Sequence, residues 1–333
     1  TIISALGGFI NSIETRILFN GNEIHDIDKY PPNKRPFGIM FQNPILFEHF
    51  NVEENLDFVI KRNQIKNQNK SSISKEYLIE HLELNSLLKR SPENLSGGEK
   101  LRVVLARTIL KQPKYLLLDE PMSDLDIKYK AKLLVFLKNF NKKFKIPMLY
   151  ITHSIEEISQ IGDQIVLIKD GKKIDNGAVS DILNTNLFGD LTGKFELSSV
   201  LDGIVVSNDH NLHITTLDVD GQKLIVPGYP GKFNNEVRVR IRSRDILLSS
   251  SRLKSKITEN ELEGFISTIE IEKNSAFSEL VILLKNLKNN KNIQKVRARI
   301  TTYNLKKMKL SRNDTVFIYI SSVSIDRQAY QSI

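Results

Sequence analysis

A glycine-rich segment of the sequence has the residues that a phosphate site requires. Leu95-Ser96-Gly97-Gly98-Glu99 opens a run whose apolar residues have helical spacing. The two glycines allow a ligand close to the backbone, and the free N–H groups at the start of a helix attract anions. A serine cap followed by a flexible turn explains the same letters. This segment alone therefore supports phosphate binding and simple capping about equally.

An acidic pair follows an apolar run farther along the chain. Asp119 and Glu120 come directly after residues 115–118, which are typical of a buried strand. One carboxylate in such a place can hold the Mg²⁺ of a nucleotide, and a second can polarise a water. A strand that merely ends in an acidic turn is as common. The two segments together are more specific, because about twenty residues separate them, as a helical crossover between parallel strands requires.

Polar residues end two further candidate strands. Gln42 follows residues 38–41, and His153 follows the apolar run at 147–152. A lone histidine is usually structural, but a histidine in a series of polar strand ends is not the usual case. We therefore group Gln42 and His153 with the acidic pair as candidate site residues.

The elements that must position these residues alternate along the first half of the chain. Short apolar runs predict buried parallel strands, and apolar residues at helical spacing predict helices between them. This is the pattern of an α/β domain. The expected strands are residues 39–41, 115–118, 148–151 and 165–168. The expected helices are residues 102–110, which the segment 95–99 opens, and residues 130–144. Asn20-Gly21 predicts a turn, and Asp170-Gly171 predicts a hairpin of residues 165–169 and 172–176.

From about Phe195 onward, short alternating segments replace the helical spacing. They predict a small all-β barrel or sandwich, separated from the first half by residues 184–194, which are rich in Asn, Thr and Gly. The expected strands are residues 212–217, 223–226, 237–241, 264–271, 296–300 and 315–320.

The composition is that of a globular protein. The 333 residues suffice for two domains with cores, and 40% of them are apolar while 26% are charged. The absence of cysteine excludes disulfides and thiolate metal sites. The net charge of +9 is spread along the chain without a basic motif interleaved with aromatic residues, so we expect no nucleic-acid partner.

The order of the motifs resembles the ABC ATPase family. Gln42, LSGGE at 95–99, LLLDEP at 116–121, SDLD at 123–126 and His153 follow one another as in that family, across nearly all of the first half. The resemblance implies an α/β P-loop NTPase (ABC ATPase) domain over residues 1–190, with a helical subdomain at about 48–110. It also implies ATP and Mg²⁺ as cofactors.

The same resemblance implies a role for each motif residue. Asp119 and Gln42 correspond to Mg²⁺ ligands, and Gln42 also senses the membrane partner in that family. Glu120 corresponds to the general base for the attacking water, and His153 to the switch histidine.

The family works as a head-to-tail dimer with nucleotide between the subunits, which implies a homodimer here. Ser96, Gly97, Gly98 and Glu99 correspond to the signature that binds the ATP of the opposite subunit. Asp126 corresponds to the loop that follows the acidic strand end. A lone subunit then holds only half of each site.

Further stretches resemble the ATP-binding subunits of molybdate importers, namely residues 35–42, 46–50, 146–154, 237–246 and 318–325. They imply that residues 195–330 form an OB-like regulatory domain of the TOBE/Mop type and that the chain energises molybdate uptake. Importers of sulfate, iron, sugars and polyamines share parts of these stretches, so another substrate stays open. Glu259 stands where the pattern has a basic or neutral residue, and we expect weak or absent oxyanion binding by this domain.

The resemblance also implies partners and a location. We expect a peripheral subunit on the cytoplasmic face of the cell membrane, with membrane permease subunits docking at Gln42–Phe58. Phe47 and Phe50 are the candidate contacts, although core packing is the alternative explanation for these rings. A periplasmic or extracellular binding protein would act indirectly.

One motif of the family, the phosphate loop G-x-x-x-x-G-K-[ST], is absent from the printed sequence. Residues 1–8 resemble the helix after this loop, with Thr1 just after, or alternatively at, its Mg²⁺-binding hydroxyl position. We expect a chain truncated before or at the end of the loop and inactive as printed. A non-catalytic regulatory subunit is the alternative if the loss is genuine.

Sequencing the DNA upstream of the Thr1 codon tests this expectation. Codons for Gly-x-Gly-Lys and then Ser or Thr are expected, because that loop supplies the N–H groups and the lysine that hold the phosphates. Any other reading would indicate a degenerate ATPase.

Overall fold

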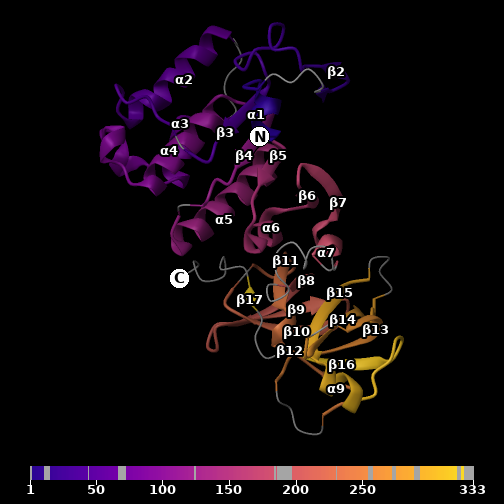
Figure 1. Cartoon of the computed structure of the whole chain (residues 1–333). Coiled ribbons are helices and arrows are strands. Elements are labelled where there is room, and N and C mark those ends of the chain that lie inside the picture. Colours follow the sequence, from indigo (N-terminus) through magenta and orange to yellow (C-terminus); the bar gives the residue numbers. More distant parts are fainter. Residues whose placement is uncertain are drawn as a thin grey trace. The chain divides into compact units, whose positions relative to one another are not determined.

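The computed structural model describes residues 2–10, 16–43, 45–66, 73–123, 125–183, 185, 197–229, 231–253, 258–271, 275–288, 293–320 and 324–325. The chain folds as two compact units, Thr1–His153 and Ser154–Ile333 (Figure 1). Thr1 itself lies outside the described residues.

A parallel sheet of three strands organises the first unit. Its order is β3 (Phe37–Met40), β4 (Tyr115–Asp119) and β5 (Met148–Ile151), and both pairs are parallel. The central strand β4 buries Leu116 and Leu118 completely. A strand covered on both faces needs such an apolar run. The prediction of parallel strands is confirmed for these three runs.

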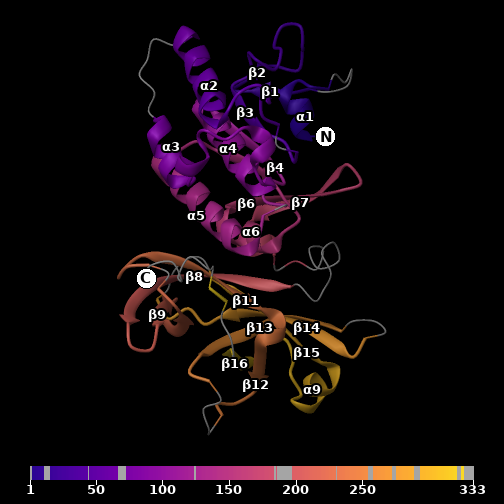
Figure 2. The same cartoon turned by 90° about the vertical axis from the view of Figure 1, so that its left-hand side faces the viewer.

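Helices complete the first unit. Short helix α1 (Ile2–Gly7) packs Ile3 into a core with Phe37 and Leu117. Figure 2 shows α2, α3 and α4 grouped on one side of the sheet, within the region where we expected a helical subdomain. The bounds of the longer elements are α2 (Val52–Lys66), α3 (Lys75–His81), α4 (Gly97–Leu110) and α5 (Ile127–Phe144), with 3-10 turns at Asn85–Leu87 and Pro92–Asn94.

The predicted turn at Asn20-Gly21 is confirmed. It joins β1 (Leu18–Phe19) to β2 (Asn22–Glu23), which pair antiparallel. Asn20 and Gly21 have φ values of 49° and 80°. Two consecutive left-handed residues match the twist of a two-residue hairpin, and Asn-Gly adopts them at little cost.

The prediction of a buried parallel strand at residues 165–168 is wrong. These residues form β6 (Gln164–Lys169), which pairs antiparallel with β7 (Lys172–Ala178) in a separate two-stranded sheet. The turn residues Asp170 and Gly171 have positive φ and send the chain straight back, as the hairpin signal predicted. Burial alternates along β6, so only one of its faces is covered.

In the second unit, the β6–β7 hairpin packs against the start of the β-rich part of the chain. A small core joins Ile155 of α6 (Ile155–Ile161) and Val179 of α7 (Val179–Ile182) to Leu197 and Val200 near the start of β8. Residues on both sides of the expected boundary at 184–194 therefore pack together. The extent of the ATPase domain to residue 190 stays a prediction.

Two five-stranded sheets share one large core in the rest of this unit, which confirms the all-β prediction. One sheet has the order β10-β9-β8-β11-β17 and the other β12-β16-β13-β14-β15. The strands are β8 (Ser198–Asp209), β9 (Ile214–Val219), β10 (Gln222–Pro227), β11 (Glu236–Arg242), β12 (Ile246–Ser249), β13 (Glu261–Ile271), β14 (Phe277–Leu284), β15 (Lys295–Thr301), β16 (Thr315–Ile320) and β17 (Ser324–Ile325). A 3-10 turn (Ser243–Asp245) and a short helix α9 (Thr302–Lys307) connect some of them.

A buried ion pair lies across neighbouring strands β14 and β15. Arg297 Nη1 donates to Glu279 Oε2 at 2.6 Å, and the two side chains are 1% and 5% exposed. The backbone N–H of Arg297 donates to Ser199 Oγ of β8 at 2.7 Å. Removing one partner of such a pair leaves a charge in a dry environment.

We therefore expect Arg297→Met to lower the free energy of unfolding by about 3–5 kcal/mol, measured by chemical denaturation. The double variant Glu279→Leu with Arg297→Met should recover most of this loss, because no charge is then left buried. Arg312→Met, at an exposed position outside the strands, is the control and should cost less than about 0.5 kcal/mol. A double variant no more stable than Arg297→Met alone would contradict the explanation.

Candidate active site

Three polar side chains from three parallel strands meet at one edge of the sheet. Glu120 directly follows β4, while Gln42 and His153 lie just beyond β3 and β5. Gln42 Nε2 donates to Glu120 Oε2 at 3.4 Å, and His153 Nδ1 lies 3.4 Å from Glu120 Oε1. Both contacts are long, so each can be exchanged for a contact to a ligand at small cost. The grouping of these residues from the sequence agrees with this geometry.

The backbone of Glu120 is held in an unusual conformation. Its φ is 42°, which is uncommon for a residue with a side chain. The Glu120 N–H donates to the Ile151 carbonyl at 3.0 Å, and its own carbonyl accepts from Ser123 N and Oγ, both at 3.3 Å. These three bonds hold a tight turn that places the carboxylate between Gln42 and His153. Strained backbone of this kind is concentrated at functional sites.

Oxygen donors at this edge suit a magnesium ion that also binds phosphate. The described residues contain no group of three or more His, Asp or Glu side chains that could hold a metal by themselves. Mg²⁺ commonly takes only one or two protein ligands and completes its shell with phosphate and water. Asp119, the half-buried last residue of β4, and the exposed amide of Gln42 fit this role.

Ser96 caps helix α4 within the glycine-rich segment. Ser96 Oγ accepts from Glu99 N at 3.3 Å, and Glu99 Oε2 accepts from Ser96 N at 2.8 Å, which is a capping box. The hydrogen bond from the Ser96 backbone N–H holds the pKa of the Glu99 carboxyl below its usual range. Capping therefore accounts for Ser96 and Glu99 but not for the two glycines between them.

The two glycines differ in their surroundings. A Cβ added to Gly98 would lie 2.8 Å from Leu125 Cδ2, so the Leu125 side chain would have to shift to admit a larger residue there. A Cβ on Gly97 would meet nothing within 4 Å. Crowding inside the described chain does not explain Gly97, whereas the approach of a ligand from outside would.

Asp126 and the signature segment do not join the strand-edge cluster directly. Asp126 Oδ1 accepts from Tyr129 N at 3.1 Å and thereby caps α5. No hydrogen bond or ion pair connects residues 96–99 to Gln42, Glu120 or His153 in the part of the chain that the structure describes. The sequence motifs thus fall into two separate groups within one subunit.

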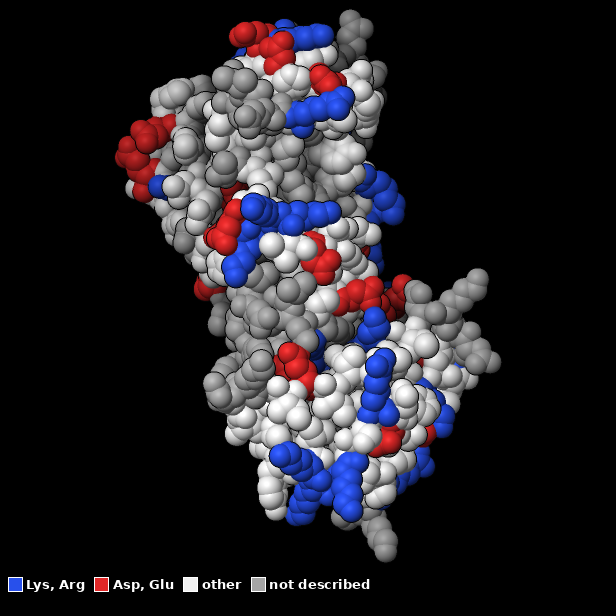
Figure 3. All heavy atoms as spheres, turned by 45° about the vertical axis from the view of Figure 1, so that its right-hand side comes forward, with Lys and Arg blue, Asp and Glu red and all other residues white. Residues whose placement is uncertain are grey.

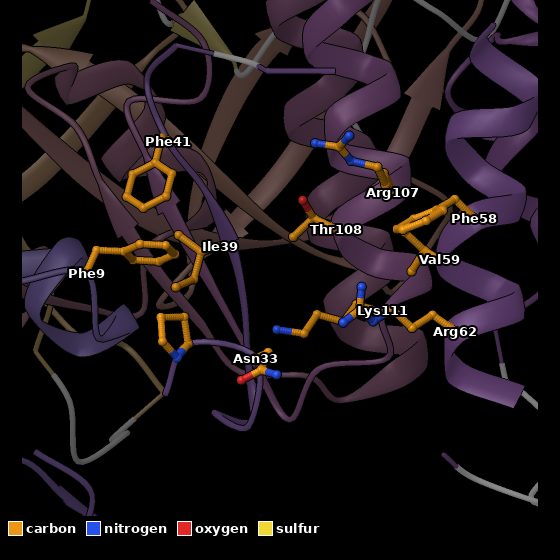
Figure 4. A pocket seen from close by; sticks show the side chains of 11 residues that line it. Phe9, Asn33, Ile39, Phe41, Phe58, Val59, Arg62, Arg107, Thr108 and Lys111 are labelled. Atoms are coloured by element: carbon orange, nitrogen blue, oxygen red, sulfur yellow. The ribbon is translucent and has the colours of Figure 1, made fainter. Parts of the chain in front are cut away.

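A cavity of about 310 Å³ lies in the first unit, lined by residues of β3, α2 and α4 together with Phe9. Figure 4 shows Phe9 and Phe41 on one wall and side chains of α2, including Phe58, on the other. The Phe9 and Phe41 rings are 5.3 Å apart in an edge-to-face contact. The sequence pattern indicates residues 42–58 but neither Phe9 nor the cavity, because only the fold brings the end of α1 next to β3.

Phe47 and Phe50 lie in the loop before α2. The Phe47 ring packs 4.9 Å from Phe58 and 6.0 Å from Phe50, and Phe47 is still 36% exposed. The rings are thus partly packed and partly accessible, so core packing accounts for them only in part, and docking of a partner stays a prediction.

Comparison with known proteins places the chain in a family. The ABC transporter family description matches residues 1–123. The molybdenum import ATP-binding protein ModC of Haemophilus influenzae is 31% identical over 328 residues, which cover 98% of this chain and 89% of that protein. ModC 1 of Azotobacter vinelandii is 31% identical over 81% of this chain and 74% of its own length. A solved dimeric ATP-binding cassette bound to ADP and Pi has a TM-score of 0.46 and 23% identity over 54% of this chain.

The chain belongs to the ABC transporter family of ATP-binding proteins. Within this family it is a member of the group formed by the molybdenum import ATP-binding proteins. Among the described helices, none has the length and apolar character needed to cross a membrane.

The strain at Glu120 predicts that glycine at this position stabilises the fold, although it removes the carboxylate of the candidate site. Glu120→Gly should increase the free energy of unfolding by about 1 kcal/mol relative to Glu120→Ala, because only glycine adopts φ near 42° without a steric cost. Thermal or chemical denaturation of both variants measures the difference. Since both lack the carboxylate, their loss of contacts to Gln42 and His153 is matched. Equal stability of the two would show that the turn is not strained.

Proposed function

We propose that this chain is the ATP-binding and ATP-hydrolysing subunit of an importer that energises molybdate uptake across the cytoplasmic membrane. The observation that carries the proposal is the meeting of Gln42, Glu120 and His153 at the strand edge. Similarity to molybdenum import proteins over nearly the whole chain supports the choice of substrate. On this proposal the subunit works at the cytoplasmic face of the membrane, as a peripheral protein.

Each residue at the strand edge would have its own role in ATP hydrolysis. Glu120 would accept a proton from the attacking water, since its carboxylate is partly exposed and held in place by a rigid turn. His153, with an 82% exposed side chain, would orient the water or a phosphate oxygen. Asp119 and Gln42 would hold Mg²⁺, which screens phosphate charge when it is bound. Thr1 stays a further candidate for the nucleotide site.

A second copy of the chain would complete the site. Gly97 leaves the N-terminus of α4 open, and its N–H groups suit a phosphate. The signature residues Ser96, Gly97, Gly98 and Glu99 lie apart from Glu120 within one subunit, which supports a role at the nucleotide of a partner subunit. Asp126 caps α5 next to this segment and would help to set the shape of that interface.

The cavity and the loop that carries Phe47 and Phe50 would together give a membrane permease subunit a place to dock on this chain. Phe9, Phe41 and Phe58 offer an apolar surface between α1, β3 and α2, and Phe47 and Phe50 border the same helix. Grooves of this kind accept the apolar face of a helix, here one from a membrane permease subunit. A periplasmic or extracellular substrate-binding protein would act through that permease.

The β-rich part of the chain supports a structural role more than an oxyanion site. Asn260 is nearly buried and bonds both backbone groups of Ile225, at 2.6 and 2.8 Å. Thr258 Oγ1 donates to the Ile320 carbonyl at 2.9 Å. Polar side chains at 258–260 thus tie strands together, and weak or absent oxyanion binding stays our expectation. Figure 3 shows a face on which the described basic side chains are interspersed with acidic ones.

Uptake in the source cells tests the function and the substrate together. Deleting the gene should abolish uptake of labelled molybdate at low concentration while leaving sulfate uptake intact. The wild-type gene should restore it, and Glu120→Gln should not, since it keeps the size of the side chain but removes the base; we expect ATP turnover to fall at least about 100-fold.

The outcomes separate the alternatives. Unchanged molybdate uptake on deletion would point to another importer substrate such as sulfate, iron, a polyamine or a sugar. Full restoration by the Glu120→Gln variant would favour a non-catalytic regulatory subunit.

A further inference from the structure

Arg107 of helix α4 bonds to the loop Ile45–Phe50, which precedes α2. Arg107, near the C-terminal end of α4, donates through Nη2 to the Ile45 carbonyl and through Nη1 to Asn55 Oδ1 at 3.2 Å. Its guanidinium lies 4.8 Å from the centre of the Phe47 ring. The planar guanidinium thus contacts the start of the loop, the Phe47 ring of the loop and helix α2, which follows the loop.

Asn55 completes the attachment from α2. It is fully buried, and its amide nitrogen donates to the carbonyls of Phe47 and Phe50, both at 3.1 Å, and of Asn51 at 3.0 Å. Its Oδ1 accepts from Phe47 N at 3.0 Å as well as from Arg107. Asn55 therefore fixes the shape of the loop, and Arg107 connects this fixed shape to α4.

The connection runs along a rigid element to the other end of α4. The helix begins at Gly97 and is one continuous α-helix through Leu110. A helix rises about 1.5 Å per residue, so Arg107 and the open N-terminus are about 15 Å apart on one rod. Burial lowers the pKa of Arg107, because its charge is partly removed from water.

We infer that Arg107 is a positioning residue that transmits movement of the loop Ile45–Phe50 to the N-terminus of α4. The inference rests on the proposed function, in which the permease touches this loop and the α4 N-terminus touches nucleotide. Arg107 contacts neither Glu120 nor His153, so it acts through the loop and the helix and takes no part in proton transfer. Its two donors and its ring contact need a planar fork, and a lysine cannot make all three contacts.

The first test uses the complete importer in proteoliposomes. The measured quantity is the ratio of the ATPase rate with molybdate-loaded binding protein to the basal rate. Arg107→Lys and Arg107→Gln should each lower this ratio about tenfold. Lys61→Gln is the control, because Lys61 is an exposed basic residue of α2 that is not part of the cavity lining. Its ratio should stay within about twofold of wild type.

Two results of this test would overturn the inference. Equal reduction of both rates, with an unchanged ratio, would mean that Arg107 only supports folding. A wild-type ratio in the Arg107→Lys variant would mean that positive charge suffices and that the fork is not needed.

The second test does not depend on transport or ATP hydrolysis. Amide hydrogen exchange in residues 45–50 of the purified subunit should become about tenfold faster in both Arg107 variants and stay unchanged in Lys61→Gln. Unchanged protection of the loop in the Arg107 variants would overturn the inference even if the importer works as proposed. Faster exchange of residues 45–50 in the Arg107 variants of a protein that hydrolyses no ATP would instead support the attachment of the loop by Arg107 and contradict the proposed function.

Discussion

The turn after the central strand is the constraint on which the candidate active site depends. β4 is paired on both sides, so its end is fixed in three dimensions by β3 and β5. Glu120 leaves the strand with a left-handed φ, and the bond from its N–H to Ile151 ties it to the neighbouring strand. With an ordinary extended φ the strand would continue, and the side chain would point out of one face of the sheet. The backbone strain thus positions the carboxylate, and the sheet supplies the rigidity that maintains the strain.

Helix α4 is the second organising element, because its two ends serve different surfaces. At its N-terminus, Gly97 leaves the backbone open while Gly98 allows contact with Leu125. Toward its C-terminus, Thr108 and Lys111 bond to backbone groups, and Arg107 reaches the loop before α2. The middle is buried through Leu101, Val104 and Leu105. A helix buried along its middle moves as one body, so a displacement at either end is felt at the other.

The sequence was most informative where local chemistry decides the structure. The hairpin turns at Asn20-Gly21 and Asp170-Gly171, the helix after Ser96 and the apolar strands of the parallel sheet all follow from residue types within a short window. The run at 165–168 was misassigned as a buried parallel strand because apolar content alone does not reveal which faces are covered. β14 does not follow from the sequence pattern, because its apolar run contains Glu279, a charged residue that is buried together with Arg297 of β15.

In the candidate site, too, some residues can be predicted from the sequence and others are brought in only by the fold. Gln42, Glu120 and His153 could be grouped from the sequence, since each ends an apolar run. Phe9 could not be assigned to the site from the sequence, because its role depends on contacts between segments far apart in the chain. Asn55 could not be assigned either, because its role depends on the burial of a polar side chain. A fully buried asparagine with four backbone partners looks, in the sequence, like any polar residue in the first turn of a helix.

The exposure of the strand edge has a consequence for catalysis under the proposed function. His153 is almost entirely exposed and Glu120 is about one-third exposed, so both are hydrated in the lone subunit. A general base acts best where water is limited to the molecule that reacts, because a wet site screens the charges that stabilise the transition state. The described residues of one subunit leave this edge open. Elsewhere on the same chain, the first N–H groups of α4, which have no partner within the helix, lie beside the open space at Gly97. Bringing the α4 terminus of a second copy over the edge would close the site and supply those donors together, so that hydrolysis would require the dimer even though every residue at the strand edge comes from one chain.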